Sequence, residues 1–218
     1  MFTEQIDILR CPAPHEDSWL VAASTHAEGR HIIVGTLGCP VCKASYEIVE
    51  GEVRFSDAPL DTSSGPMDTE LAFALAAQLH LVEAPLPVML TGGWSRAVAP
   101  LRTLVPTVSF LVGDAQSLIQ LDDRVSTLRL PLTGIPLATG SIRGLALDAV
   151  HASDAFLTAA SSVVCTSGRL VLPASSALDP SLWRTLASDG HVTVAERLPV
   201  ASALVPLRRA PAKPLFEP

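Results

Sequence analysis

Four residues within the first 42 positions have the types and spacing of a zinc site. Cys39 and Cys42 form a C-x-x-C pair, and Cys11 lies upstream with His15 four positions after it. Thiolates and a neutral imidazole are the usual ligands of structural zinc, which holds together segments too short to build their own core. The first knuckle has Pro14 where a second thiolate is expected. His15 can complete a Cys3His set in its place.

Three interpretations of these residues stay open. In the first, His15 completes the zinc site, with Asp17 as a fallback fourth ligand. In the second, the metal is lost and the small domain is held by packing alone. In the third, Cys39 and Cys42 form a redox pair in a reducing compartment. The side chains that would do the packing are Ile6, Leu9, Trp19, Ile33 and Tyr46.

A second candidate site lies in residues 87–96, where a short apolar run ends in Gly92 and Gly93 before a helical pattern. A strand that ends in glycine and leads into a helix is where doubly wound α/β domains bind nucleotide-like ligands, because free backbone N–H groups converge there. Asp114 follows the next apolar run and could accept hydrogen bonds from ribose hydroxyls or cap a helix. Gly92, Gly93 and Asp114 are therefore the predicted cofactor contacts.

A third group follows a later apolar run. Asp148, His151 and Asp154 could supply a general base, since a histidine beside carboxylates can exchange protons near neutral pH. The interpretation that we favour is structural: Asp148 ends a strand, and Ser153 or Asp154 caps the next helix. No residue is therefore predicted to be catalytic.

The elements that position these residues alternate between strand and helix from residue 88 onward. This alternation predicts a Rossmann-like α/β fold with a mostly parallel sheet, and two closing strands without a helix between them predict an antiparallel edge hairpin. A helix is expected from Asp68 to about Val82. The expected strands are 88–91, 108–112, 127–130, 144–148, 169–173, 192–196 and 203–207, and the expected later helices are 94–104, 115–121, 153–164 and 180–188.

The domain organisation follows from a turn-rich stretch near residue 60. We expect a small β domain of the zinc-ribbon type at 1–57, a linker at 58–66, the α/β domain at 67–210 and a tail at 211–218.

Composition excludes several classes of function. The chain has 218 residues, 48% of them hydrophobic, and a net charge of −7. Lys43 and Lys213 are the only lysines, so direct binding of nucleic acid is not expected. The most apolar segment, 71–90, contains Gln78, His80, Glu83 and two prolines, and the chain begins without a positively charged signal region. We expect no membrane span and a cytoplasmic protein.

Two sequence resemblances add to this interpretation. The segments "ILRCP" and "GCPVCKASYEIVEGEVRF" resemble the zinc ribbon of the small activator subunit of tRNA and translation-factor methyltransferases. A similar ribbon is fused to bacterial class I methyltransferases, including ribosomal RNA guanine methyltransferases. The resemblance implies zinc and another methyltransferase as the protein partner. A self-associated oligomer is the alternative form of partnership that we expect. This chain departs from the pattern at Pro14.

The remainder resembles class I S-adenosylmethionine-dependent methyltransferases. The segments "IPLATGSI" and "SGRLVL" are similar to the "LPFADGSFD" and "L-x-PGGRLVL" segments of that family. The resemblance implies that S-adenosylmethionine binds at the glycine turn and at Asp114. The opening motif differs, because Leu90 stands for the family's acid while Trp94 and Arg96 replace two of its three glycines.

Three functions follow from these features. The eroded loop favours a methyltransferase-like pseudoenzyme that acts as a non-catalytic structural or regulatory partner. An active S-adenosylmethionine-dependent methyltransferase with a divergent motif is the first alternative. An activator subunit of another methyltransferase is the second.

Overall fold

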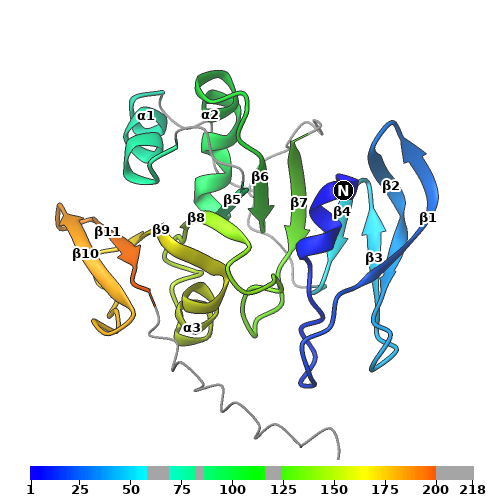
Figure 1. Ribbon diagram of the computed structural model, residues 1–218. Helices are drawn as coiled ribbons and strands as arrows, with labels where there is room; N and C mark the ends of the chain where they lie inside the picture. Colours follow the sequence, from blue (N-terminus) through cyan, green and yellow to red (C-terminus); the bar gives the residue numbers. More distant parts are fainter. Residues whose placement is uncertain (58–68, 82–85, 116–123, 200–218) are drawn as a thin grey trace, which may run out of the picture.

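The computed structural model describes residues 1–57, 69–81, 86–115 and 124–199. The expected linker at 58–66, Asp68, the strand at 203–207, most of the helix at 115–121 and the tail at 211–218 lie outside these residues. The described strands form one eleven-stranded mixed sheet in the order β1-β2-β3-β4-β7-β6-β5-β8-β9-β11-β10 (Figure 1).

The N-terminal part is an antiparallel meander that follows a short 3-10 helix. Tight turns join its strands, and Glu50 and Gly51, with φ of 53° and 79°, make the two-residue turn between β3 and β4. The elements are η1 (Thr3–Ile8), β1 (Val21–Glu28), β2 (His31–Gly38), β3 (Ser45–Val49) and β4 (Glu52–Arg54).

The centre of the sheet is a parallel α/β unit, as the sequence predicted. Its strands are β5 (Val88–Thr91), β6 (Phe110–Gly113), β7 (Val125–Arg129), β8 (Ile142–Ala146) and β9 (Val164–Pro173). In space they run β7-β6-β5-β8-β9, and each of these strands is parallel to the next one in this order. Counted from β5, this is the 3-2-1-4-5 order of Rossmann-like sheets, whose ligand crevice opens where the order reverses, beside β5 and β8.

An antiparallel hairpin closes the sheet, but one of its strands is not the predicted one. The hairpin consists of β10 (Trp183–Ser188) and β11 (Val192–Arg197), and β11 lies between β9 and β10. The helix expected at 180–188 is therefore wrong. Only Trp183 of β10 is buried and the other residues are exposed, so the strand has little apolar alternation and is defined by its pairing with β11.

Helices cover both faces of the sheet (Figure 1). The alternating side chains of β5 separate two cores, with Val88 and Leu90 under α1 and α2, and Met89 on the side of α3 and η1. The sequence prediction for 153–164 is confirmed by α3, whereas the segment predicted as one helix at 94–104 begins as a 3-10 turn. The helices are α1 (Thr69–Gln78), η2 (Gly92–Ala97), α2 (Val98–Leu104) and α3 (Asp154–Val163).

The N-terminal meander joins the α/β unit through backbone pairing. Strand β4 pairs in parallel with β7, and Arg129 Nη2 lies 3.0 Å from Glu52 Oε1 across this junction. The Phe2 N–H donates to Ser126 Oγ at 2.9 Å, and the Gln5 side chain donates to the Phe110 carbonyl at 3.3 Å. The meander therefore covers the edge that β7 would otherwise expose.

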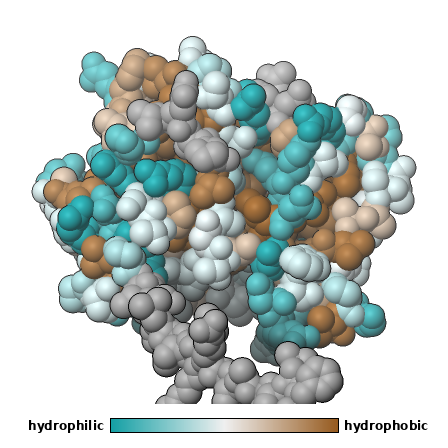
Figure 2. Space-filling view, viewed as in Figure 1, coloured by the Kyte–Doolittle hydropathy of each residue, from teal (hydrophilic) through white to brown (hydrophobic). Residues whose placement is uncertain are grey.

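The surface is mixed in polarity. Figure 2 shows hydrophobic surface near α1, where Leu71 and Phe73 are 57% and 54% exposed. Among the described residues, no helix has the length and apolar character needed to cross a bilayer.

Candidate functional sites

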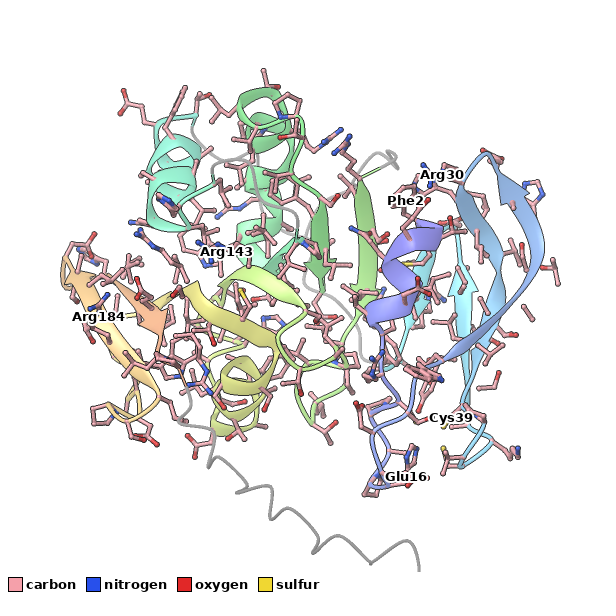
Figure 3. The ribbon with its side chains drawn as sticks, viewed as in Figure 1. Phe2, Glu16, Arg30, Cys39, Arg143 and Arg184 are labelled. Carbon is pink, nitrogen blue, oxygen red and sulfur yellow. The ribbon has the colours of Figure 1, made fainter. Side chains whose placement is uncertain are left out.

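The four predicted metal ligands meet at one end of the N-terminal meander. One ligand atom from each of Cys11, His15, Cys39 and Cys42 lies within 4.8 Å of the other three. The Cys11 and Cys42 sulfurs are 3.7 Å apart, and His15 Nε2 is 3.4 Å from Cys39 Sγ. Figure 3 shows Cys39 and Glu16 at the same end of this part of the molecule. We call these four residues the Cys3His cluster.

Local hydrogen bonds prepare the cluster for a metal. His15 Nδ1 lies 2.6 Å from the Glu16 carbonyl oxygen, which can only accept, so Nδ1 carries a proton and Nε2 is the ring nitrogen that faces the sulfurs. Burial raises the pKa of Cys39, but hydrogen bonds from the Cys42 and Val41 N–H groups outweigh it and bring this pKa to about 6. The arrangement thus presents an imidazole nitrogen and a thiolate to the same point.

The donor set fits zinc, which takes four sulfur and nitrogen ligands in structural sites. Asp17, the fallback ligand, is directed elsewhere: its carboxylate is 72% exposed and lies 3.4 Å from Arg10 Nε. The alternative in which packing alone holds the N-terminal part expects Trp19 to be buried, but this side chain is 66% exposed. Ile6 and Leu9 are buried, as that alternative expects. All four cysteines of the chain are free thiols.

The second site lies at the carboxyl ends of β5, β6 and β8, where a Rossmann-like sheet has its ligand crevice. Gly92 turns the chain there with φ of 48°, and the Gly93 N–H donates to Asp148 Oδ2 at 2.9 Å. A Cβ on Gly92 would overlap the same carboxylate. The glycine turn is therefore closely covered by a side chain from the end of β8.

His151 joins that carboxylate to Asp114. Its Nδ1 lies 2.5 Å from Asp148 Oδ1, and its Nε2 lies 2.8 Å from Asp114 Oδ2. The other Asp114 oxygen accepts the Leu130 N–H at 3.0 Å. His151 is 6% exposed and its ring meets Phe156 edge to face. We call Asp114, His151 and Asp148 the Asp-His-Asp bridge.

The charges of the bridge follow from its geometry. Burial lowers the pKa of His151, but the hydrogen bonds and charges of Asp114 and Asp148 outweigh it and raise this pKa to about 9. Burial raises the pKa of Asp148, but His151 and the backbone N–H groups of Gly93 and His151 bring it below its usual value. The imidazole is therefore a cation that uses both N–H groups, and it has no lone pair with which to act as a base.

Two further side chains fix the loop in the positions where the resemblance expects glycines. Trp94 Nε1 donates to the Leu147 carbonyl at 3.1 Å, and Arg96 Nε donates to the Gly93 carbonyl at 3.0 Å. A cavity of about 290 Å³ lies between this loop and the ends of β8, β9 and β11. Its apolar lining includes Leu71, Trp94, Leu147, Pro173 and Val192.

The structure brings the three predicted cofactor contacts, Gly92, Gly93 and Asp114, to one crevice. Asp148 and His151, from the group that the sequence analysis interpreted as structural, lie there as well. Asp148 binds the glycine turn and His151, and Asp154 lies apart from them in the first turn of α3. Ser153 precedes this helix at the N-cap position, without a side-chain capping bond. The usable signal was that carboxyl ends of parallel strands meet at one edge, which places Asp114 and Asp148 near each other.

Comparisons with known proteins find distant structural likeness only. No protein-family model matches the chain, and no curated protein matches it. Among solved structures, the geranyl diphosphate C-methyltransferase from Streptomyces coelicolor A3(2) is similar over 48% of this chain and 42% of its own, with 13% identity and a TM-score of 0.41. An O-methyltransferase family protein from Burkholderia thailandensis is similar over 62% of this chain and 58% of its own, with 13% identity and a TM-score of 0.40.

A third structure, an S-adenosyl-L-methionine methyl transferase from Silicibacter pomeroyi DSS-3, is similar over 58% of this chain and 88% of its own. Its identity is 14% and its TM-score 0.40. The chain spans less than half the length of the geranyl diphosphate methyltransferases that it matches. Likeness at this level carries no conclusion about activity, and the α/β assignment rests on the strand order of the sheet itself.

Proposed function

We propose that this chain is a methyltransferase-like protein whose cofactor crevice is closed by its own side chains, and that it acts as a non-catalytic structural or regulatory partner of another protein. We further propose that the Cys3His cluster binds one structural zinc ion. The observation that carries the first proposal is the Asp-His-Asp bridge across the carboxyl ends of β6 and β8.

The bridge engages the groups that a nucleotide-like ligand would need. The Gly93 N–H, which could face such a ligand, donates to Asp148. The Asp114 carboxylate could accept hydrogen bonds from ribose hydroxyls. One of its oxygens is already hydrogen-bonded to His151 Nε2, and the other accepts the Leu130 N–H. S-adenosylmethionine would have to displace a buried, charge-assisted network, and breaking one partner of such a network costs about 3–5 kcal/mol.

An active enzyme with a divergent loop is the competing function, and it has one supporting feature. The cavity beside Trp94 has an apolar lining and reaches Asp148, so a small molecule has space near the bridge. The opposing feature is His151, whose two ring nitrogens are both engaged by carboxylates, so His151 has no free nitrogen with which to act as a general base.

The pairing of the N-terminal meander with the α/β unit argues against an activator subunit that uses this strand edge. Its strand β4 is already paired with β7 of the same chain, so this edge is not available to a separate methyltransferase. Partnership through another surface remains part of the proposal, and a stoichiometric second protein in material purified from the native host would support it.

Calorimetric titration with S-adenosylmethionine and S-adenosylhomocysteine tests the closed crevice. The expected result is no saturable heat at millimolar ligand, and saturable micromolar binding would overturn the proposal.

A further inference from the structure

A side chain outside the Cys3His cluster touches one of its sulfurs. Tyr46 lies on β3, and its hydroxyl oxygen is 3.2 Å from Cys11 Sγ although 35 positions separate the two residues. A deprotonated thiolate has no proton to give, so the phenol is the donor when Cys11 serves as a ligand. Tyr46 is the only tyrosine of the chain.

The two knuckles differ in their backbone donors. In the second knuckle, Cys39 Sγ receives the N–H groups of Val41 and Cys42. In the first, Pro14 stands three residues after Cys11, where the second knuckle has Cys42, and proline has no N–H. Cys11 Sγ receives one backbone donor, from Ala13. The first knuckle thus lacks the second backbone bond that would orient its sulfur.

The frame around Tyr46 holds its hydroxyl in place. Tyr46 pairs with Leu37 in the sheet, and its ring lies against Phe55 with 4.9 Å between ring centroids. The Phe55 N–H in turn donates to the Arg129 carbonyl at the end of β7. The phenol is therefore fixed by the sheet and by the junction with the α/β unit.

We propose that Tyr46 is a positioning residue of the zinc site, whose hydroxyl replaces the backbone donor that Pro14 removes and orients the Cys11 thiolate toward the metal. This inference rests on the zinc binding proposed above. Hydrogen bonds to ligand atoms fix their orientation and basicity, and their loss typically lowers metal affinity about 10–100-fold.

The test compares the full-length chain with Tyr46→Phe, which keeps the ring on Phe55 and removes only the hydroxyl. Zinc affinity is measured by competition with a chromophoric chelator, and the thiolate-to-cobalt absorption of the Co²⁺-loaded protein reports the sulfur ligands. We expect zinc affinity to fall at least about tenfold, the cobalt absorption to shift, and the unfolding midpoint of the metal-free protein to stay unchanged.

Two control variants separate positioning from packing. Ser45→Ala changes the exposed neighbour of Tyr46 on β3 and should leave zinc affinity and cobalt absorption unchanged. Phe55→Leu removes the ring contact but keeps the phenol, so it should lower stability and should change the zinc affinity and the cobalt absorption less than Tyr46→Phe does. Equal zinc affinity in wild type and Tyr46→Phe, or the same losses in Phe55→Leu, would overturn the inference. A wild-type chain that binds neither metal would overturn the zinc site itself, which is a distinct result.

Discussion

The imidazole of His151 lies 2.8 Å from the carboxylate of Asp114, although 37 residues separate them, and it joins the carboxyl ends of β6 and β8 across β5. With Asp148 on its other nitrogen, this imidazole occupies the crevice in which the fold would otherwise receive a ligand. The protein thus uses its crevice for an internal charge network.

This network predicts a pH dependence of stability. The pKa of His151 is raised to about 9 in the folded state, against about 6.5 when unfolded. Its stabilisation, at most about 3 kcal/mol, is complete below about pH 6.5 and is lost as the pH rises through 9. The lowered pKa of Asp148 adds stabilisation that is lost as the pH falls below about 4.

Urea unfolding of wild type and His151→Gln between about pH 5 and 10 measures this contribution, because the difference between the two cancels the other titrating groups. We expect wild type to be the more stable protein at pH 6 and its advantage to shrink toward pH 10. A difference that does not change with pH would contradict the charge assignment.

The contact between the glycine turn and Asp148 predicts a large cost for Gly92→Ala. A Cβ at Gly92 would overlap the Asp148 carboxylate, and its φ of 48° adds about 1–2 kcal/mol of strain for a residue with a side chain. We expect a loss of at least about 3 kcal/mol in the free energy of unfolding.

Gly29→Ala is the matched control, since Gly29 has φ of 58° and no atom within 4 Å of its Cβ position. This variant should show the strain alone, about 1–2 kcal/mol. Equal losses in the two variants would mean that Asp148 does not lie against the turn. Adding Asp148→Ala to Gly92→Ala should recover part of the larger loss.

Zinc binding predicts about one metal ion per purified chain, measured by elemental analysis. His15→Ala should reduce the zinc content, because it removes the only nitrogen of the Cys3His cluster. His26→Ala is the control, since His26 is exposed on β1 and pairs with Glu28. Wild-type protein purified without zinc and unable to take it up would contradict the site, as would equal zinc content in His15→Ala.

The sequence predicted more of the Cys3His cluster than of the Asp-His-Asp bridge. Contacts between residues close in sequence follow from spacing, whereas contacts between distant residues depend on the fold. The second knuckle is local: Cys39 and Cys42 share one turn, so their proximity follows from spacing alone. Asp114 and Asp148 could be placed at one edge of a parallel sheet. The sequence could not predict that His151 bridges them. The bridge depends on how the chain turns after β8, and on the separation of the ends of β6 and β8, which lie on either side of β5.

The same limit explains the wrong helix at 180–188. Residues Arg184 to Ser188 are exposed and carry no strand alternation, so local propensity did not reveal β10. Its pairing runs from Trp183 opposite Arg197 to Ser188 opposite Thr193, and residues 189–191 form the turn. Strand formation there depends on β11, which is itself placed by β9.

The measurement that tests the closed crevice most directly is calorimetric titration of S-adenosylmethionine into wild type, Asp148→Ala and Asp114→Ala. We predict no saturable heat and no thermal shift for wild type at millimolar ligand, whereas Asp148→Ala, which frees the Gly93 N–H, is the variant in which weak binding could emerge. Saturable micromolar binding to wild type that is weakened by Asp114→Ala would contradict the account, because it would mean that Asp114 serves the cofactor and not the bridge.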